Sequence, residues 1–206
     1  MKALIGADII DGTGGPVLKD SAILIDGERI IDVGPRAAVT LPPNTEEINL
    51  TGLTLLPGLI DTHDHLAHKN YTLDSRWEIQ EPASVHHLKT AKAIEESLAA
   101  GYTCIRDAGG FVHGDNAREI ELMVERGLSN MMAIQTATGW AAECVGQEKN
   151  FGTVKKGLYA DFLVVDGDPL KDISVLRNKD LIKMVMKGGV AYIDNLLVGD
   201  PQAVGD

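Results

Sequence analysis

Two histidines separated by one residue, His63 and His65, have the types and spacing needed to bind a metal. Alternate residues of a β-strand point to the same face, so both imidazoles would leave a strand on one side. Two neutral imidazoles held in this way make half of a divalent metal site of the kind that suits zinc. The pair follows an apolar run that turns at Pro57-Gly58 and resumes as Leu59-Ile60. We therefore predict that His63 and His65 are metal ligands.

The residues around this pair resemble a motif of the amidohydrolase superfamily, metal-dependent hydrolases built on a (β/α)₈ barrel. The motif reads Pro-Gly-hydrophobic-Ile-Asp-x-His-x-His and stands at the end of the first barrel strand. We expect Asp61 to orient a ligand histidine rather than to bind the metal itself. The chain matches the motif at Pro57, Gly58, Ile60, Asp61, His63 and His65.

Composition and charge limit the number of domains and the kinds of partner that this chain can have. The 206 residues suffice for one large domain or two small ones, with 44% hydrophobic and 24% charged residues. A net charge of −11 argues against nucleic acid or an anionic membrane as a partner.

The sequence shows neither a membrane span nor a signal peptide. No apolar stretch approaches the ~20 residues of a membrane span. Gly6 and Asp8 interrupt the N-terminal apolar run, which favours a strand over a signal peptide. Cys104 and Cys144 form no framework or metal spacing, so reduced core thiols in the cytoplasm are expected.

The elements that must position the histidine pair begin with short strands in residues 2–56. Asp26-Gly27 predicts a hairpin between two of them. The glycine-rich segment 11–16 is not followed by a helix start, so we interpret it as a turn rather than a phosphate site. The predicted strands are Lys2–Ile10, Ser21–Ile25, Arg29–Val33, Glu47–Leu50 and Leu53–Leu56.

A helix and a strand follow a predicted loop at residues 67–82. The helix is expected at about 84–100, ending at Gly101. The strand from Tyr102 runs into a glycine pair at Gly110 and resembles the second barrel strand of the imidazolonepropionase-like and Xaa-Pro-dipeptidase-like branch. The residues of the helix predicted to face inward are Val85, Leu88, Ala91, Ile94 and Leu98.

Two further helical segments are expected before the chain returns to strands. The first, to about Arg126, starts at Asp115 or Asn116, with Glu119 at capping-box spacing. The second starts at Ser129 and continues to Gly146. It resembles the last barrel helix of the superfamily and the helix after it, matching an Ala-Thr-x-x-Ala-Ala pattern.

The C-terminal segment resembles the closing strands of the superfamily. Residues 152–166 match its Gly-x-hydrophobic-x-x-Gly-x-x-Ala-Asp pattern, and Lys183–Met186 and Val190–Ile193 form a hairpin across Gly188-Gly189. We expect these strands to complete the β-domain begun at the N-terminus. The predicted domains are 1–55 with 152–195 as a composite β-domain, 56–151 as a partial barrel, and 196–206 as a tail.

The segment between the two β parts is short for a barrel. Residues 56–151 are fewer than half of the about 250 residues of a typical barrel, and at roughly 30 residues per βα unit they hold about three units. The resemblance implies that the third to eighth strands are absent, with the join near 110–113. The predicted fold class is therefore α/β: a small β-sandwich-like domain built from both chain ends, plus a truncated remnant of a (β/α)₈ TIM-type barrel.

The same omission affects the metal site that the resemblance implies. The family adds a carbamylated lysine or a glutamate, two later histidines and an aspartate on the last strand, and no position here matches them. Asp115 stands at a helix start and is not given the aspartate role. Catalytic residues are thus unassigned, and His63 and His65 are the predicted ligands of a divalent metal, with zinc the expected ion.

The other titratable residues are given structural roles. His68 is expected to be a solvated loop residue, and His86 and His87 to lie within a helix in surface or packing roles. Arg106 and Asp107 are expected to form a structural ion pair at least as readily as to take part in catalysis.

The implied activity is metal-assisted hydrolysis of an amide or similar C–N bond, in which the metal lowers the pKa of bound water and polarises the carbonyl. The resemblance implies a small cyclic amide or a dipeptide as the substrate. The alternative is a non-catalytic remnant that acts as a folding, assembly or binding unit. The unpaired edges of an incomplete barrel favour a homo-oligomer.

Overall fold

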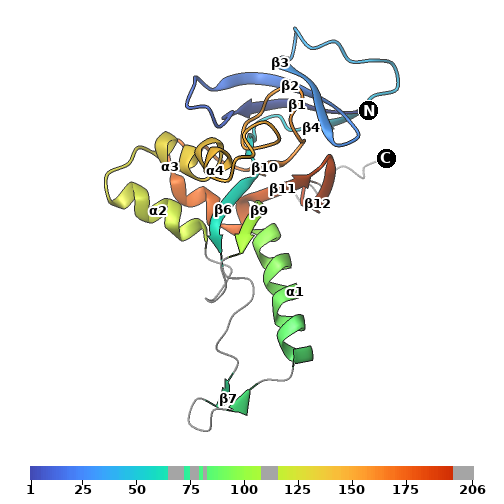
Figure 1. Cartoon of the computed structure of the whole chain (residues 1–206). Coiled ribbons are helices and arrows are strands. Elements are labelled where there is room, and N and C mark those ends of the chain that lie inside the picture. The colour runs from blue at the N-terminus through green and yellow to red at the C-terminus, as the bar shows by residue number, and fades with distance from the viewer. Residues whose placement is uncertain (65–71, 75–78, 81–82, 108–115, 197–206) are drawn as a thin grey trace, which may run out of the picture.

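The computed structural model describes residues 1–64, 72–74, 79–80, 83–107 and 116–196 (Figure 1). Strands from both ends of the chain share one eight-stranded sheet. These strands are β1 (Lys2–Ile9), β2 (Leu18–Asp26), β3 (Arg29–Pro35), β4 (Glu46–Asn49), β5 (Thr54–Pro57), β10 (Phe162–Val165), β11 (Ile182–Lys187) and β12 (Val190–Asp194). Their order is β12-β11-β10-β5-β1-β2-β3, with β4 beside β1. All five strands predicted in the N-terminal part are confirmed, as are both hairpins.

Strand β1 pairs with two different strands along one edge. Lys2–Ile5 pairs in parallel with β4, and Asp8–Ile9 pairs in parallel with β5. The change of partner falls at Gly6, whose φ is +86° and where an added Cβ would overlap Thr51 Oγ1. Only glycine adopts this left-handed conformation without cost, so Gly6 lets the strand shift its register.

The sheet carries a hydrophobic core on each face. In β10, Phe162 and Val164 pack on one side with residues of β1, β2 and β3, whereas Leu163 and Val165 pack on the other side with the helices. The strands form one continuous sheet, because β5 is hydrogen-bonded to both β1 and β10. Residues of β2 and β3 nevertheless share a core cluster with residues of β11, so the two ends of the sheet pack face to face, as expected of a sandwich-like domain. The division into domains at 55/56 and 151/152 stays a prediction.

A parallel pair of strands follows the large sheet. β6 (Leu59–Asp64) and β9 (Tyr102–Asp107) are connected through α1 (Ala83–Ala99), and Figure 1 shows them side by side, with α1 running away from the large sheet. Within the described ranges this part of the chain has two parallel strands, which pair with each other, and a short antiparallel ribbon of β7 (Thr72–Asp74) and β8 (Ile79–Gln80). The rest of the predicted loop at 67–82 lies outside the described residues.

Helix α1 confirms the predicted range and part of the predicted inward face, since Leu98 packs against the core. Leu88 is 72% exposed and Ile94 is 49% exposed, whereas Ala93, Ser97 and Ala100 are buried. Small side chains let the helix lie close against β9, and this close contact decides which face is covered. Periodicity assumes that every apolar position meets a neighbour, which does not hold for Leu88 and Ile94.

Three helices cover one side of the sheet: α2 (Ala117–Glu125), α3 (Asn130–Thr136) and α4 (Gly139–Cys144). Ser129 caps α3 as predicted, because its Oγ accepts a hydrogen bond from the Met132 N–H. The helical segment predicted to run from Ser129 to Gly146 is divided at Ala137–Thr138. The capping box is wrong, because Asn116 makes no side-chain cap.

Two short 3₁₀ helices, η1 (Ile173–Leu176) and η2 (Lys179–Leu181), were not predicted from the sequence. Glu121 on α2 links α2 to this segment, because Arg118 and Arg177 both approach its carboxylate, at 2.6 and 3.4 Å. None of the helices in the described ranges has the length and apolar character needed to cross a membrane.

The two cysteines are free, but only one has the predicted core position. Cys104 packs against the buried cluster of Ile60, Ala141 and Ala142, and burial raises the pKa of its thiol while the Lys187 charge opposes this change. We therefore assign Cys104 to packing. Cys144 is exposed, which corrects the prediction of two core thiols.

Gly58 is expected to tolerate no larger side chain. An added Cβ would overlap Thr103 Oγ1 and lie 2.8 Å from Thr103 Cβ, and Thr103 is only 7% exposed. Gly58→Ala should therefore lower the free energy of unfolding by about 1–3 kcal/mol, the usual cost of overpacking, in urea denaturation.

The matched control is Gly34→Ala. A Cβ at Gly34 would lie 3.6 Å from Val39 Cγ2, an ordinary contact, and neither glycine has a positive φ. The control should change stability by less than about 0.5 kcal/mol. Equal losses for the two variants would show that the approach of Gly58 to Thr103 does not constrain the fold.

Candidate metal-binding and substrate cavity

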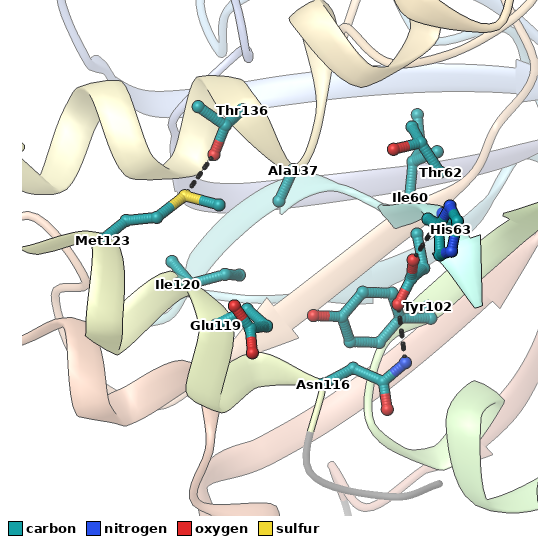
Figure 2. A pocket seen from close by; sticks show the side chains of 11 residues that line it. Ile60, Thr62, His63, Tyr102, Asn116, Glu119, Ile120, Met123, Thr136 and Ala137 are labelled. Carbon is teal, nitrogen blue, oxygen red and sulfur yellow. Dashed lines mark hydrogen bonds between the residues drawn. The ribbon is translucent and has the colours of Figure 1, made fainter. Parts of the chain in front are cut away.

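A cavity of about 340 Å³ lies where β6, β9 and the helices α2 and α3 meet (Figure 2). Its volume falls at the lower end of the range for small-molecule sites. The lining combines titratable and apolar side chains. The residues are Ile60, Asp61, Thr62, His63, Tyr102, Asn116, Glu119, Ile120, Met123, Thr136 and Ala137.

Strand β6 is held on both edges, which fixes its position beside the cavity. On one edge it pairs in parallel with β9. On the other edge, the Ile60 N–H donates to the Ala137 carbonyl at 2.8 Å, at the break between α3 and α4. The helix break therefore has a structural role, because it frees a carbonyl group that an unbroken helix would use internally.

The Asp61 carboxylate accepts hydrogen bonds from the backbone next to it and from the Asn116 side chain, which stands just before α2. Its Oδ1 accepts a hydrogen bond from the His63 N–H at 2.9 Å, and its Oδ2 accepts one from Asn116 Nδ2 at 2.8 Å (Figure 2). The sequence predicts that Asp61 orients a ligand histidine. In the structure the carboxylate holds the backbone of His63 and also joins β6 to the start of α2.

His63 is exposed and lines the cavity. It follows Asp61 by two residues, and its backbone N–H donates to the Asp61 carboxylate. His65, the second predicted ligand, lies outside the described residues, as do His68 and His113. In the described ranges, His, Cys, Asp and Glu side chains form no group of three or more that could hold a metal. The structure therefore places one of the two predicted ligands at the cavity.

The remaining candidates have structural positions. His87 is exposed on α1, as predicted; His86 belongs to the same helix. Arg106 Nε donates a hydrogen bond to the Thr62 carbonyl, which ties β9 to β6. Arg106 thus has a partner other than the predicted Asp107, whose side chain lies outside the described residues.

Sequence reasoning missed three polar residues of the cavity: Tyr102, Glu119 and Thr136. Glu119 was interpreted only as part of a capping box. A signal was available, because Asn116, Glu119 and Met123 recur at helical spacing and so share one face of α2. This spacing predicts a common face, but not that the face borders a cavity.

Two comparisons with known sequences identify the family. The Amidohydrolase family model matches residues 91–191, a range that begins after the histidine pair. An imidazolonepropionase of Arthrobacter sp. (strain FB24) is 30% identical over 145 residues, 70% of this chain and 29% of that protein. An ochratoxinase of Aspergillus niger is 31% identical over 103 residues, 49% of this chain and 22% of that protein. The chain spans less than a third of the length of these curated relatives.

Solved structures of other proteins share the fold of this chain. A prolidase complexed with N-methylphosphonate-L-proline superposes with a TM-score of 0.75 at 15% identity, over 94% of this chain and 99% of that chain. The A. niger ochratoxinase superposes with a TM-score of 0.73 at 14% identity, over 94% and 95%. The chain belongs to the amidohydrolase superfamily and is similar in sequence to imidazolonepropionases and ochratoxinases.

The bond between Asn116 and Asp61 is expected to stabilise the cavity wall. Asn116→Ala should lower the free energy of unfolding by about 1–2 kcal/mol, because it leaves a partly buried carboxylate oxygen without its donor. Asn116→Asp should cost more at neutral pH, since two carboxylates would then face each other. That extra cost should decrease as the pH falls and one carboxylate becomes protonated.

Urea denaturation at pH 7 and pH 4 measures both effects. Asn150→Ala is the matched control, because the Asn150 amide donates to the exposed Gln147 Oε1; we expect it to change stability by less than about 0.5 kcal/mol. Equal losses for Asn116→Ala and Asn150→Ala would contradict a role for the Asn116 bond in holding α2 against β6.

Proposed function

We propose that this chain is a module for metal-dependent hydrolysis of C–N bonds in small amides or dipeptides, with the metal weakly held. The observation that carries the proposal is the position of His63, which lies near the end of a parallel strand and lines a cavity of small-ligand size in an amidohydrolase fold. Family membership supports the reaction class, and the cavity supports a small substrate.

The proposed metal ligands are His63 and, by resemblance, His65. The exposed imidazole of His63 fits a borderline metal such as zinc. Asp61 is not among the proposed ligands, because each of its oxygens already accepts a hydrogen bond that holds the cavity wall together. Two imidazoles fall short of the three protein ligands plus water of catalytic zinc sites, so we propose weak binding. When bound, the metal would lower the pKa of its water and polarise the substrate carbonyl.

We further propose that the third to eighth strands of the barrel are absent from this chain. In support, β6, α1 and β9 follow one another as in a barrel, and the next helices in sequence are α2 and α3, which pack beside β6. The proposal implies that the later-strand ligands and the last-strand aspartate of the family have no counterpart here. General-base assistance to the water, typically worth about 10²–10⁴-fold, would then be lost.

A second candidate function is supported by the surface of the partial barrel. In the described ranges β9 pairs only with β6, and the Leu88 and Ile94 side chains of α1 are exposed. Open strand edges and exposed apolar side chains favour association. We therefore propose that two copies associate through residues 56–115, and that a chain without catalytic activity would serve as an assembly or binding unit.

The metal proposal predicts a zinc content below one equivalent after dialysis against a mild chelator. Elemental analysis measures this, and His63→Ala with His65→Ala should remove what remains. The isolated chain with added zinc should not hydrolyse N-acyl amino acids, Xaa-Pro dipeptides or cyclic amides at an enzyme-like rate. A full equivalent of retained zinc, or zinc-dependent turnover abolished by His63→Ala, would show that further ligands complete the site.

The association proposal predicts a dimer or larger assembly in light scattering. Leu88→Lys and Ile94→Lys together should shift the mass to that of a monomer, because they place charges on the exposed side of α1. Trp140→Lys is the matched control, since Trp140 is similarly exposed, at 42%, but belongs to α4. A monomeric parent chain, or an equal effect of the control, would exclude association through this helix.

A further inference from the structure

We propose that Glu119 makes the cavity selective for small amides that carry a positively charged amino group. This inference rests on the proposed function, because it assumes that the cavity receives an amide. It adds the chemical class of the ligand and assigns the residue that recognises it. The ligand would be an α-amino amide, with its ammonium group at Glu119 and its amide group toward His63.

Two carboxylates line the cavity, those of Asp61 and Glu119, and they differ in how far the protein itself supplies hydrogen-bond donors to them. Both Asp61 oxygens accept hydrogen bonds, from the His63 N–H and from Asn116 Nδ2. No residue that the structure describes donates a hydrogen bond or forms a salt bridge to the Glu119 carboxylate. An acceptor of this kind is the natural partner of a ligand cation.

The surroundings of Glu119 fit the rest of such a ligand. Figure 2 shows the Tyr102 hydroxyl pointing toward the Glu119 carboxylate, with His63 on the other side of the tyrosine ring. Tyr102 is only 5% exposed and Ile120 only 2% exposed, so this wall is well packed. Ile120, Met123 and Ala137 supply an apolar surface for a side chain of the ligand. In Figure 2, Ile120 and Met123 lie on one side of Glu119, and Tyr102 and His63 lie on the other.

Selectivity follows from the cost of removing a carboxylate from water. A neutral ligand that fills the cavity would displace water from Glu119 without replacing its hydrogen bonds, which is unfavourable. A ligand with an ammonium group would supply a charge-assisted hydrogen bond at the same position. The site therefore discriminates partly by penalising the neutral ligand, as specific sites commonly do.

The test compares two ligands of nearly the same shape, L-leucinamide and 2,4-dimethylpentanamide, in which a methyl group replaces the ammonium group. Their affinities are measured by NMR titration of the full chain in the presence of EDTA, at about pH 6.5, below the pKa of about 7.7–8.0 of an α-amino group. We expect leucinamide to bind about tenfold more tightly, which corresponds to one hydrogen bond to a charged group. Glu119→Gln should reduce the ratio to about one.

Glu148→Gln is the control for general attraction of cations to an acidic protein, because Glu148 is exposed, as Glu119 is, but lies outside the cavity. It should leave the preference unchanged. Raising the pH to about 9 should weaken leucinamide binding to the wild-type chain, because the ligand then loses its charge. Thermal melts establish that Glu119→Gln is folded; if it is not, Glu119→Asp, which keeps the charge, should retain the preference.

Equal affinities for the two amides, no binding of either one, or an unchanged preference in folded Glu119→Gln would overturn the proposal. Because EDTA is present, the result does not depend on the metal. A failure here is therefore distinguishable from a failure of the proposed metal-dependent hydrolysis, which the zinc content and the turnover measure separately.

Discussion

The hydrogen bonding of β5 to both β1 and β10 is the interaction on which the rest of the structure depends. All four residues of β5 are buried, and they pair with β10 from Thr54↔Val165 to Pro57↔Phe162. This short strand lies between the N-terminal and C-terminal strands in the sheet and leads directly into β6. The position of the candidate site is therefore set by a strand that requires both ends of the chain to be in place.

The Pro-Gly pair after β5 has a physical reason that is separate from metal chemistry. Pro57 has no N–H to donate and stands where β5 ends. The Gly58 N–H donates to the Asp161 carbonyl at 2.9 Å, and its missing side chain leaves room for Thr103 of β9. Lys187 then donates to the Thr103 carbonyl at 2.8 Å and lies 3.5 Å from Asp161. The large sheet and the parallel pair are thus joined at one point by backbone and charged groups.

Two carboxylates line the cavity: that of Asp61, whose two oxygens accept hydrogen bonds from the protein, and that of Glu119. Asp61 is committed to holding the chain at His63 and to binding α2, which makes it part of the framework. Glu119 is on the same helix face as Asn116 and has no partner in the described part of the protein. A single helix therefore supplies both the residue that stabilises the wall and the residue that we propose to select the ligand.

The sequence by itself determined the family, the strands at both ends, both hairpins, the ranges of α1 and α2, and His63 as a strand-end residue. These features depend on local patterns such as alternation, glycine turns and the Pro-Gly-x-Ile-Asp-x-His-x-His spacing, which are read within a few residues. Tertiary structure alone decided that the strands form one sheet, and that α1 buries Ala93 and Ser97 rather than Leu88 and Ile94. It also brought Tyr102, Glu119 and Thr136 to His63. These outcomes depend on which segments, far apart in the sequence, come into contact, and periodicity within one segment contains no information about its neighbours.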